Sequence, residues 1–140
     1  MVKNSMKALL FAAGFLSLTC LLGGCNEHFV DTGADNKGKL SSVRSALQIY
    51  YGDHAGIFPD GLGELTKDSK YFKELPKLKL PEHPATNEVL YLDSQSMAPK
   101  LLTDTGGYVY FNSKKYPQTF GNIAINCTHE LKKGEPAYSW

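Results

Sequence analysis

The sequence carries almost no net charge, and this absence excludes several classes of function. It has 15 basic and 14 acidic residues among 140, for a formal charge of +1. It also lacks a long basic run, so it shows no sign of the positively charged surface by which proteins bind nucleic acids. We therefore expect no nucleic-acid partner and no strong electrostatic attraction to anionic membranes.

Cysteines and metal-ligand motifs are also scarce. The chain has three cysteines and four histidines, with no His-x-x-x-His and no Cys-x-x-Cys. Structural zinc sites commonly use such short spacings. A calcium loop would need closely spaced aspartates, whereas segment 112–118 carries two lysines and no aspartate. We therefore expect no metal site, no calcium and no other cofactor.

The N-terminal segment is the longest apolar stretch of the chain. Two lysines precede the apolar residues 8–22, and Leu22-Gly23-Gly24-Cys25 follows. This pattern is typical of an export signal. It resembles the bacterial lipobox, in which a leucine and two small residues precede a cysteine that is acylated before cleavage. The resemblance implies a lipoprotein signal peptide over residues 1–24 and a lipid on Cys25. An uncleaved anchor helix and a plain secretory signal are the alternatives.

A lipid on Cys25 would place the protein in the bacterial cell envelope. The resemblance to lipoproteins implies a membrane anchor facing the periplasm, with the outer membrane preferred because Asn26 replaces the aspartate of inner-membrane retention. Cys20 would be lost with the signal, which leaves Cys127 as the one unmodified thiol. No intrachain disulfide is then possible, although the compartment would allow one.

A helix is expected after a polar tether. Residues 25–38 are mostly small or polar and show no periodicity, which is typical of a flexible linker, so we place the folded domain at 39–140. Within 39–58, apolar residues recur at steps of three and four, and Gly52 and Pro59 favour termination. This spacing predicts an α-helix with one apolar stripe, formed by Leu40, Val43, Leu47 and Tyr50.

Ile49 lies away from this stripe on the helix. A helix packed on its own sheet would expose it, unless the loop after Pro59 folds back over it. The alternative is that Ile49 belongs to an intermolecular surface along the helix, and we take Ile49 as the hypothetical interaction site.

The last third of the chain predicts strands. Segments 89–93, 108–112 and 123–127 are short runs of branched and aromatic residues bounded by turn residues. Their separations favour an antiparallel meander, and both faces of the second strand are expected to be covered. The prolines of 60–84 limit the middle of the chain to short helical turns, which we expect at 62–66 and 69–75. The predicted fold is α+β, one N-proximal α-helix packed on a small C-terminal antiparallel β-sheet.

The order of these elements resembles the soluble domain of type IV pilins and of type II secretion pseudopilins. The likeness covers residues 39–140 and is carried by the segments RSALQIYY and FP, then DTGGYVY, GNIAINC and the final YSW. Members of that family assemble through a long helix and are structural, so the resemblance implies a non-enzymatic protein that acts by protein contact or self-association.

The N-terminus departs from the pilin pattern. Pilin leaders end in glycine, followed by Phe and a glutamate five residues into the mature chain. Gly14 and Phe15 are present here, but Thr19 stands where the glutamate would be, and the apolar run reaches Cys25 soon afterwards. A lipid and a tether therefore replace the transmembrane half of the pilin helix in this interpretation.

The sequence also suggests two other functions. Cys127 and His129 share a face if the strand continues, and a thiol beside an imidazole can act as a nucleophile, with Asp104 or Glu130 orienting the imidazole. Nothing marks an oxyanion hole, so we expect no catalytic residues and no enzyme. The stronger alternative is a lipoprotein that binds a small molecule or glycan on an aromatic patch, drawn from Tyr91, Tyr108, Tyr110, Tyr116 and Trp140.

Overall fold

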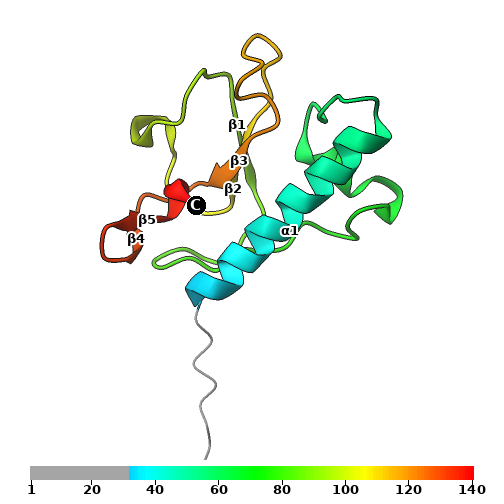
Figure 1. The fold of residues 1–140 in the computed structure, drawn as a ribbon. Helices are drawn as coiled ribbons and strands as arrows, with labels where there is room; N and C mark the ends of the chain where they lie inside the picture. Colours follow the sequence, from blue (N-terminus) through cyan, green and yellow to red (C-terminus); the bar gives the residue numbers. More distant parts are fainter. Residues whose placement is uncertain (1–31) are drawn as a thin grey trace, which may run out of the picture.

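The computed structural model describes residues 32–140, which form an α+β domain (Figure 1). Helix α1 (Thr32–Asp53) comes first, and the strands follow in the C-terminal half of the chain. The predicted fold class and layout, with an N-proximal helix packed on a small C-terminal sheet, are confirmed. Within the described residues, no helix has both the length and the apolar content to cross a membrane.

Helix α1 begins earlier than the sequence predicted. Residues 32–38 were assigned to the flexible tether, but they are helical. The Lys39 ammonium donates to the Asp35 carboxylate one turn away at 2.6 Å, and the buried side chain of Asn36 bonds to the backbone N–H and C=O of Lys79. These contacts stabilise a polar segment that has no apolar periodicity. The rest of the tether, the signal segment and Cys25 lie outside the described residues.

The predicted apolar stripe packs α1 against the sheet. Leu40, Val43 and Leu47 are almost fully buried, and Tyr50 is partly buried against the same core. Burial of each such aliphatic side chain contributes about 1.5–3 kcal/mol. In Figure 1, α1 lies diagonally across the domain, with the segment that directly follows it on one side and the C-terminal end of the chain on the other.

The main sheet is mixed rather than a meander. Strands β1 (Val89–Leu92), β2 (Tyr108–Phe111) and β3 (Ile123–Ile125) pair in the order β1-β2-β3. The β2–β3 pair is antiparallel as predicted, but β1 and β2 are parallel, so the predicted meander is wrong for this pair. Parallel neighbours need a crossover of about a dozen residues or more, and connection 93–107 is long enough to return the chain to the same end of the sheet.

Both faces of the central strand β2 are covered, as the sequence predicted. Tyr108 and Tyr110 belong to the core under α1, whereas Val109 and Phe111 pack in a second apolar cluster on the other face. Partly buried side chains of the β1–β2 connection cover this second cluster, namely Met97, Leu101 and Leu102. The domain therefore has two apolar layers, one on each face of the sheet.

The remaining segments form turns and a small hairpin. Strands β4 (Glu130–Lys132) and β5 (Glu135–Pro136) pair antiparallel. The predicted helical turn near Leu62 is a 3₁₀ turn, Leu62–Leu65, but a 3₁₀ turn at Lys67–Ser69 takes the place of the predicted helical turn over 69–75. The final residues begin with the 3₁₀ turn Ala137–Ser139, which contacts β3.

The β2 tyrosine hydroxyls yield a first prediction. Tyr110 Oη donates to the Pro59 carbonyl at 2.6 Å inside the core, and burial raises the pKa of Tyr110, so the hydroxyl keeps its proton. We expect Tyr110→Phe to lower the free energy of unfolding by about 1–2 kcal/mol in urea titration, because a buried carbonyl loses its partner. The matched control is Tyr51→Phe, whose side chain is 40% exposed. Equal stabilities of the two variants would contradict the prediction.

Candidate functional site

Ile49 lies in an open groove on the surface of α1. Its side chain is 58% exposed, and the groove has a volume of about 550 Å³. Residues of α1 and of segment 70–72 line the groove. The lining residues are Ser42, Ser45, Ala46, Ile49, Asp53, Lys70, Tyr71 and Phe72.

An ionic contact holds the loop beside the groove rather than over it. The Asp53 carboxylate accepts hydrogen bonds from Lys70 Nζ at 2.9 Å and from Tyr71 Oη at 2.8 Å. The bond from Lys70, followed by the bond from Tyr71, lowers the pKa of Asp53. The structure therefore contradicts the alternative in which the loop after Pro59 covers Ile49. The chain after Pro59 instead runs alongside Ile49 and leaves its side chain exposed.

The aromatic patch considered for a small molecule or glycan is not formed as predicted. Tyr108 and Tyr110 are fully buried, and their hydroxyls bond to backbone carbonyls of the core. The alternation of β2 turns both rings towards α1. Tyr91 keeps 45% of its surface exposed. The burial of Tyr108 and Tyr110 nevertheless removes two of the aromatic residues on which the predicted patch depended.

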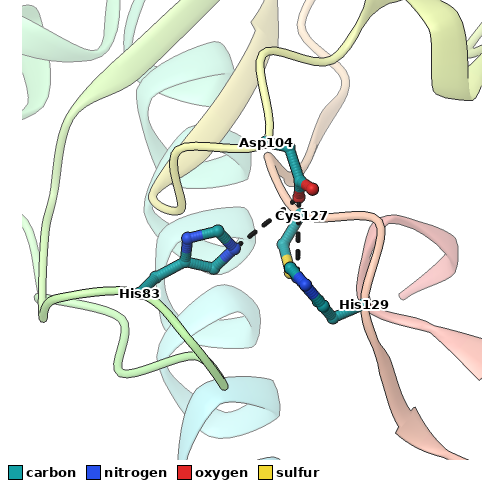
Figure 2. A group of neighbouring side chains, drawn as sticks. All are labelled: His83, Asp104, Cys127 and His129. Carbon is teal, nitrogen blue, oxygen red and sulfur yellow. Dashed lines mark hydrogen bonds and ion pairs between the residues drawn. The ribbon is translucent and has the colours of Figure 1, made fainter.

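A second group of polar side chains gathers where three loops meet (Figure 2). His83 comes from loop 78–86, which is closed by a pair of backbone hydrogen bonds between Leu78 and Thr86. Asp104 lies in the turn that precedes β2, and Cys127 and His129 follow β3. One potential ligand atom from each of the four side chains lies within 4.8 Å of the others. We call this group the 83/104/127/129 cluster.

The individual distances in the cluster are short. Cys127 Sγ is 3.4 Å from His129 Nδ1, so these two side chains meet, although β3 ends at Ile125 and the strand does not continue between them as predicted. Asp104 Oδ1 is 3.6 Å from His83 Nε2 and 3.8 Å from His129 Nδ1. Of the two acidic residues considered beside this pair, Asp104 is the one in reach, because the Glu130 carboxylate accepts a hydrogen bond from the backbone of Gly134.

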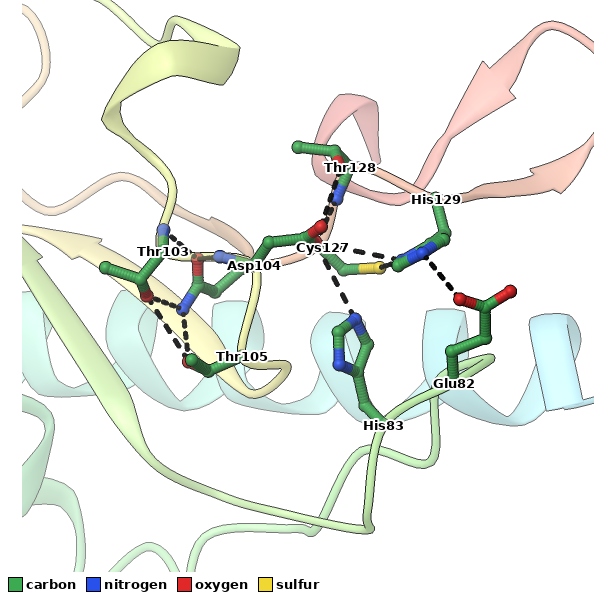
Figure 3. Close-up of polar contacts among 9 residues, drawn as sticks. Glu82, His83, Thr103, Asp104, Thr105, Cys127, Thr128 and His129 are labelled. Carbon is green, nitrogen blue, oxygen red and sulfur yellow. Dashed lines mark hydrogen bonds and ion pairs between the residues drawn. The ribbon is translucent and has the colours of Figure 1, made fainter.

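Hydrogen bonds fix the position of Asp104 (Figure 3). Its carboxylate accepts the Thr128 backbone N–H at 2.8 Å and the Thr128 hydroxyl at 2.9 Å. The buried Asn126 side chain holds the turn, because its amide donates to the hydroxyls of Thr103 at 2.8 Å and Thr105 at 3.0 Å. Thr128 therefore holds the Asp104 carboxylate, and Asn126 holds the turn that carries it.

Electrostatics argue against a cysteine nucleophile. Burial, the largest influence, raises the pKa of the Cys127 thiol, and the thiol is fully buried. A nucleophilic cysteine needs a thiolate and access to substrate. Burial also opposes ionisation of Asp104, but the bonds from Thr128 and the nearby His129 and His83 outweigh it and lower the pKa of Asp104. The cluster therefore combines a carboxylate with a protonated thiol.

The sequence did not indicate His83 as a member of this site. We expected no metal site because the histidines are scattered along the chain, but the fold brings two of the four together. The closely spaced Cys127 and His129 were visible in the sequence, and Asp104 was considered beside them. His83 joins the site because loop 78–86 packs against the turn before β2, where a Cβ added at Gly106 would lie 3.3 Å from the Cβ of His83.

Comparison of the chain with protein-family models, with curated proteins and with solved structures found no match.

Proposed function

We propose that this protein is a non-enzymatic, lipid-anchored component of the bacterial cell envelope that acts by contact with another protein through the groove beside Ile49. The observation that carries the proposal is a large apolar side chain, 58% exposed, in a groove of about 550 Å³ along a helix. Exposed apolar surface of this kind is typical of protein interaction sites. An electrostatic partner such as nucleic acid is disfavoured by the near-zero net charge.

The position of α1 relative to the proposed anchor supports this function. If Cys25 carries the lipid, the chain between it and Thr32 can span at most about 25 Å. The first turn of α1 would then lie close to the membrane surface. Since a helix rises 1.5 Å per residue, the groove would begin about 15 Å further along the helix. A partner that stands on the same membrane would be able to reach it.

The partner that best fits the groove is an apolar helix of a pilin-class subunit. Ser42, Ser45 and Ala46 have small side chains, which let a second helix approach α1 closely, and Ile49 provides an apolar contact on the same face. The layout of the domain agrees with what the pilin resemblance implies. We therefore propose an accessory role in a type II secretion or type IV pilus system, with the protein anchored on the periplasmic side, preferably in the outer membrane.

Site-specific crosslinking tests the groove. A photo-reactive amino acid at position 49 of the full-length protein in its native envelope is expected to produce one discrete protein adduct, at least about tenfold more than the same residue at position 57. Ile57 is the matched control, because it is an isoleucine of similar exposure, 55%, and does not line the groove. Mass spectrometry of the adduct identifies the partner.

A substitution that fills the groove provides a second test of the contact surface. Ser45 is exposed in the groove, so Ser45→Trp should block the adduct at position 49 without touching the core. Adducts of equal yield at positions 49 and 57, or an adduct insensitive to Ser45→Trp, would reject the contact surface. A partner outside the pilin and secretion machineries would reject the accessory role while leaving the contact function in place.

A further inference from the structure

We propose that the 83/104/127/129 cluster binds one divalent transition-metal ion, and that zinc is the preferred metal. The ligand atoms are His83 Nε2, an Asp104 carboxylate oxygen, Cys127 Sγ and His129 Nδ1. This inference is independent of the groove on α1, which draws on different residues.

The spacing of the cluster fits a tetrahedral centre. With bonds of about 2.0–2.3 Å from zinc to nitrogen, oxygen and sulfur, neighbouring ligand atoms should lie about 3.3–3.8 Å apart. The pairs Cys127–His129, His83–Asp104 and His129–Asp104 are at 3.4, 3.6 and 3.8 Å. All four atoms lie within 4.8 Å of one another, so a modest contraction of the remaining pairs would complete the coordination.

His83 provides a second, independent observation. Its side chain is only 10% exposed, and its Nε2 atom has no hydrogen-bond partner among residues 32–140. Leaving a buried polar atom unsatisfied is costly, and such atoms in a native structure need an explanation. A metal ion in the cluster supplies the missing partner, since this nitrogen faces the Asp104 carboxylate.

His129 is oriented as a metal ligand would be. Its Nε2 atom lies 3.1 Å from a carboxylate oxygen of Glu82, while Nδ1 faces Cys127. With the ring proton on Nε2 and donated to Glu82, Nδ1 offers a lone pair to the cluster. Histidines that bind metals commonly donate their other nitrogen to a carboxylate in this way. Figure 3 shows this chain of contacts from Glu82 through His129 to the cluster.

The donor set selects the metal. Calcium and magnesium prefer oxygen ligands, whereas a thiolate with two imidazoles and one carboxylate suits zinc. Binding would displace the Cys127 thiol proton to solvent, after which one thiolate and one carboxylate balance the two charges of the ion. Four protein ligands would leave no open position, which is typical of structural rather than catalytic zinc.

A metal here would join three segments that are distant in the sequence. Loop 78–86, the turn before β2 and the segment after β3 each contribute at least one ligand. Small domains often use a disulfide or a metal for such a crosslink. If Cys25 is lipidated and Cys20 removed, a metal remains available to this domain where a disulfide does not.

Cobalt substitution tests the site directly. We would use the untagged full-length chain with Cys20→Ser and Cys25→Ser, in which Cys127 is the remaining thiol. Addition of Co²⁺ to the chelator-treated protein should produce a thiolate-to-cobalt charge-transfer band and the intense visible absorption of a tetrahedral site, both saturating at one equivalent. Zn²⁺ should displace the cobalt and raise the melting temperature. Absence of the charge-transfer band would overturn the proposal.

Variants separate this site from adventitious binding. His83→Gln and His129→Gln should each weaken cobalt binding at least about tenfold, and Glu82→Gln, a change at a positioning residue, by about 10–100-fold. His54→Gln is the matched control, because the His54 ring stacks on Tyr50 outside the cluster. Circular dichroism of the metal-free proteins verifies folding. Undiminished binding in folded His83→Gln, or equal losses in His54→Gln, would show adventitious binding only and reject the site.

Discussion

Cys25→Ser is expected to move the protein from the membrane fraction into the soluble fraction of the envelope. The lipobox resemblance implies that this residue is acylated. Each buried methylene contributes about 0.8 kcal/mol, and two chains make anchoring effectively stable, whereas a single chain binds only marginally. We therefore expect membrane partitioning to fall by more than about 100-fold.

The mass of the N-terminal peptide distinguishes the alternatives for the leader. A lipid adduct on Cys25, with partitioning lost in Cys25→Ser, is the expected result. Cys20→Ser is the matched control, because Cys20 lies in the segment that the lipobox resemblance predicts to be cleaved, and this variant should remain lipidated. An N-terminus that begins at Phe15, or an unmodified Cys25, would reject the lipoprotein interpretation and favour an ordinary pilin leader.

Gly107→Ala is expected to lower the free energy of unfolding by about 3 kcal/mol or more. Gly107 has φ +74°, which costs a residue with a Cβ about 1–2 kcal/mol. An added Cβ would also overlap the backbone carbonyl oxygen of Glu88. That oxygen accepts the Tyr108 N–H at 2.8 Å, next to the β1–β2 pairing. The backbone therefore cannot move aside without disturbing the sheet.

Substitutions at two other glycines separate the cost of the positive φ from the cost of the overlap with Glu88. Gly134 also has a positive φ, +79°, but an added Cβ there would meet no described atom within 4 Å, so Gly134→Ala should cost only about 1–2 kcal/mol. Gly121→Ala should cost more than Gly134→Ala, because its Cβ would lie 2.4 Å from Cγ of Phe58, an atom that rotation of the ring does not move. Urea titration measures all three. If Gly107→Ala and Gly134→Ala lose the same stability, the overlap with Glu88 is unimportant.

The elements with strong local periodicity were predictable from the sequence. The stripe of Leu40, Val43 and Leu47 identified the buried face of α1, and the alternation of residues 108–111 located the central strand with both faces covered. The same helical spacing placed Ile49 away from the buried stripe, but only the structure decided that no loop covers it. In these segments the residues that pack the core are close in sequence, so their apolar periodicity predicts the local structure.

Other features were decided by contacts between distant segments. The first turns of α1 are polar and show no periodicity, and the bonds of Asn36 to Lys79 are what hold them against the domain. The parallel pairing of β1 with β2 depends on the path of connection 93–107, because a long connection permits either direction. Neither contact leaves a signal in the local sequence.

The 83/104/127/129 cluster shows the same limit at the candidate metal site. The sequence by itself determined one helix with a buried stripe, the strand segments, the candidate lipidation at Cys25 and the proximity of Cys127 to His129. Only the tertiary structure added His83 to that pair and placed Asp104, rather than Glu130, beside it. Periodicity and spacing describe neighbours along the chain, whereas a site built from three loops depends on how the core positions those loops in space.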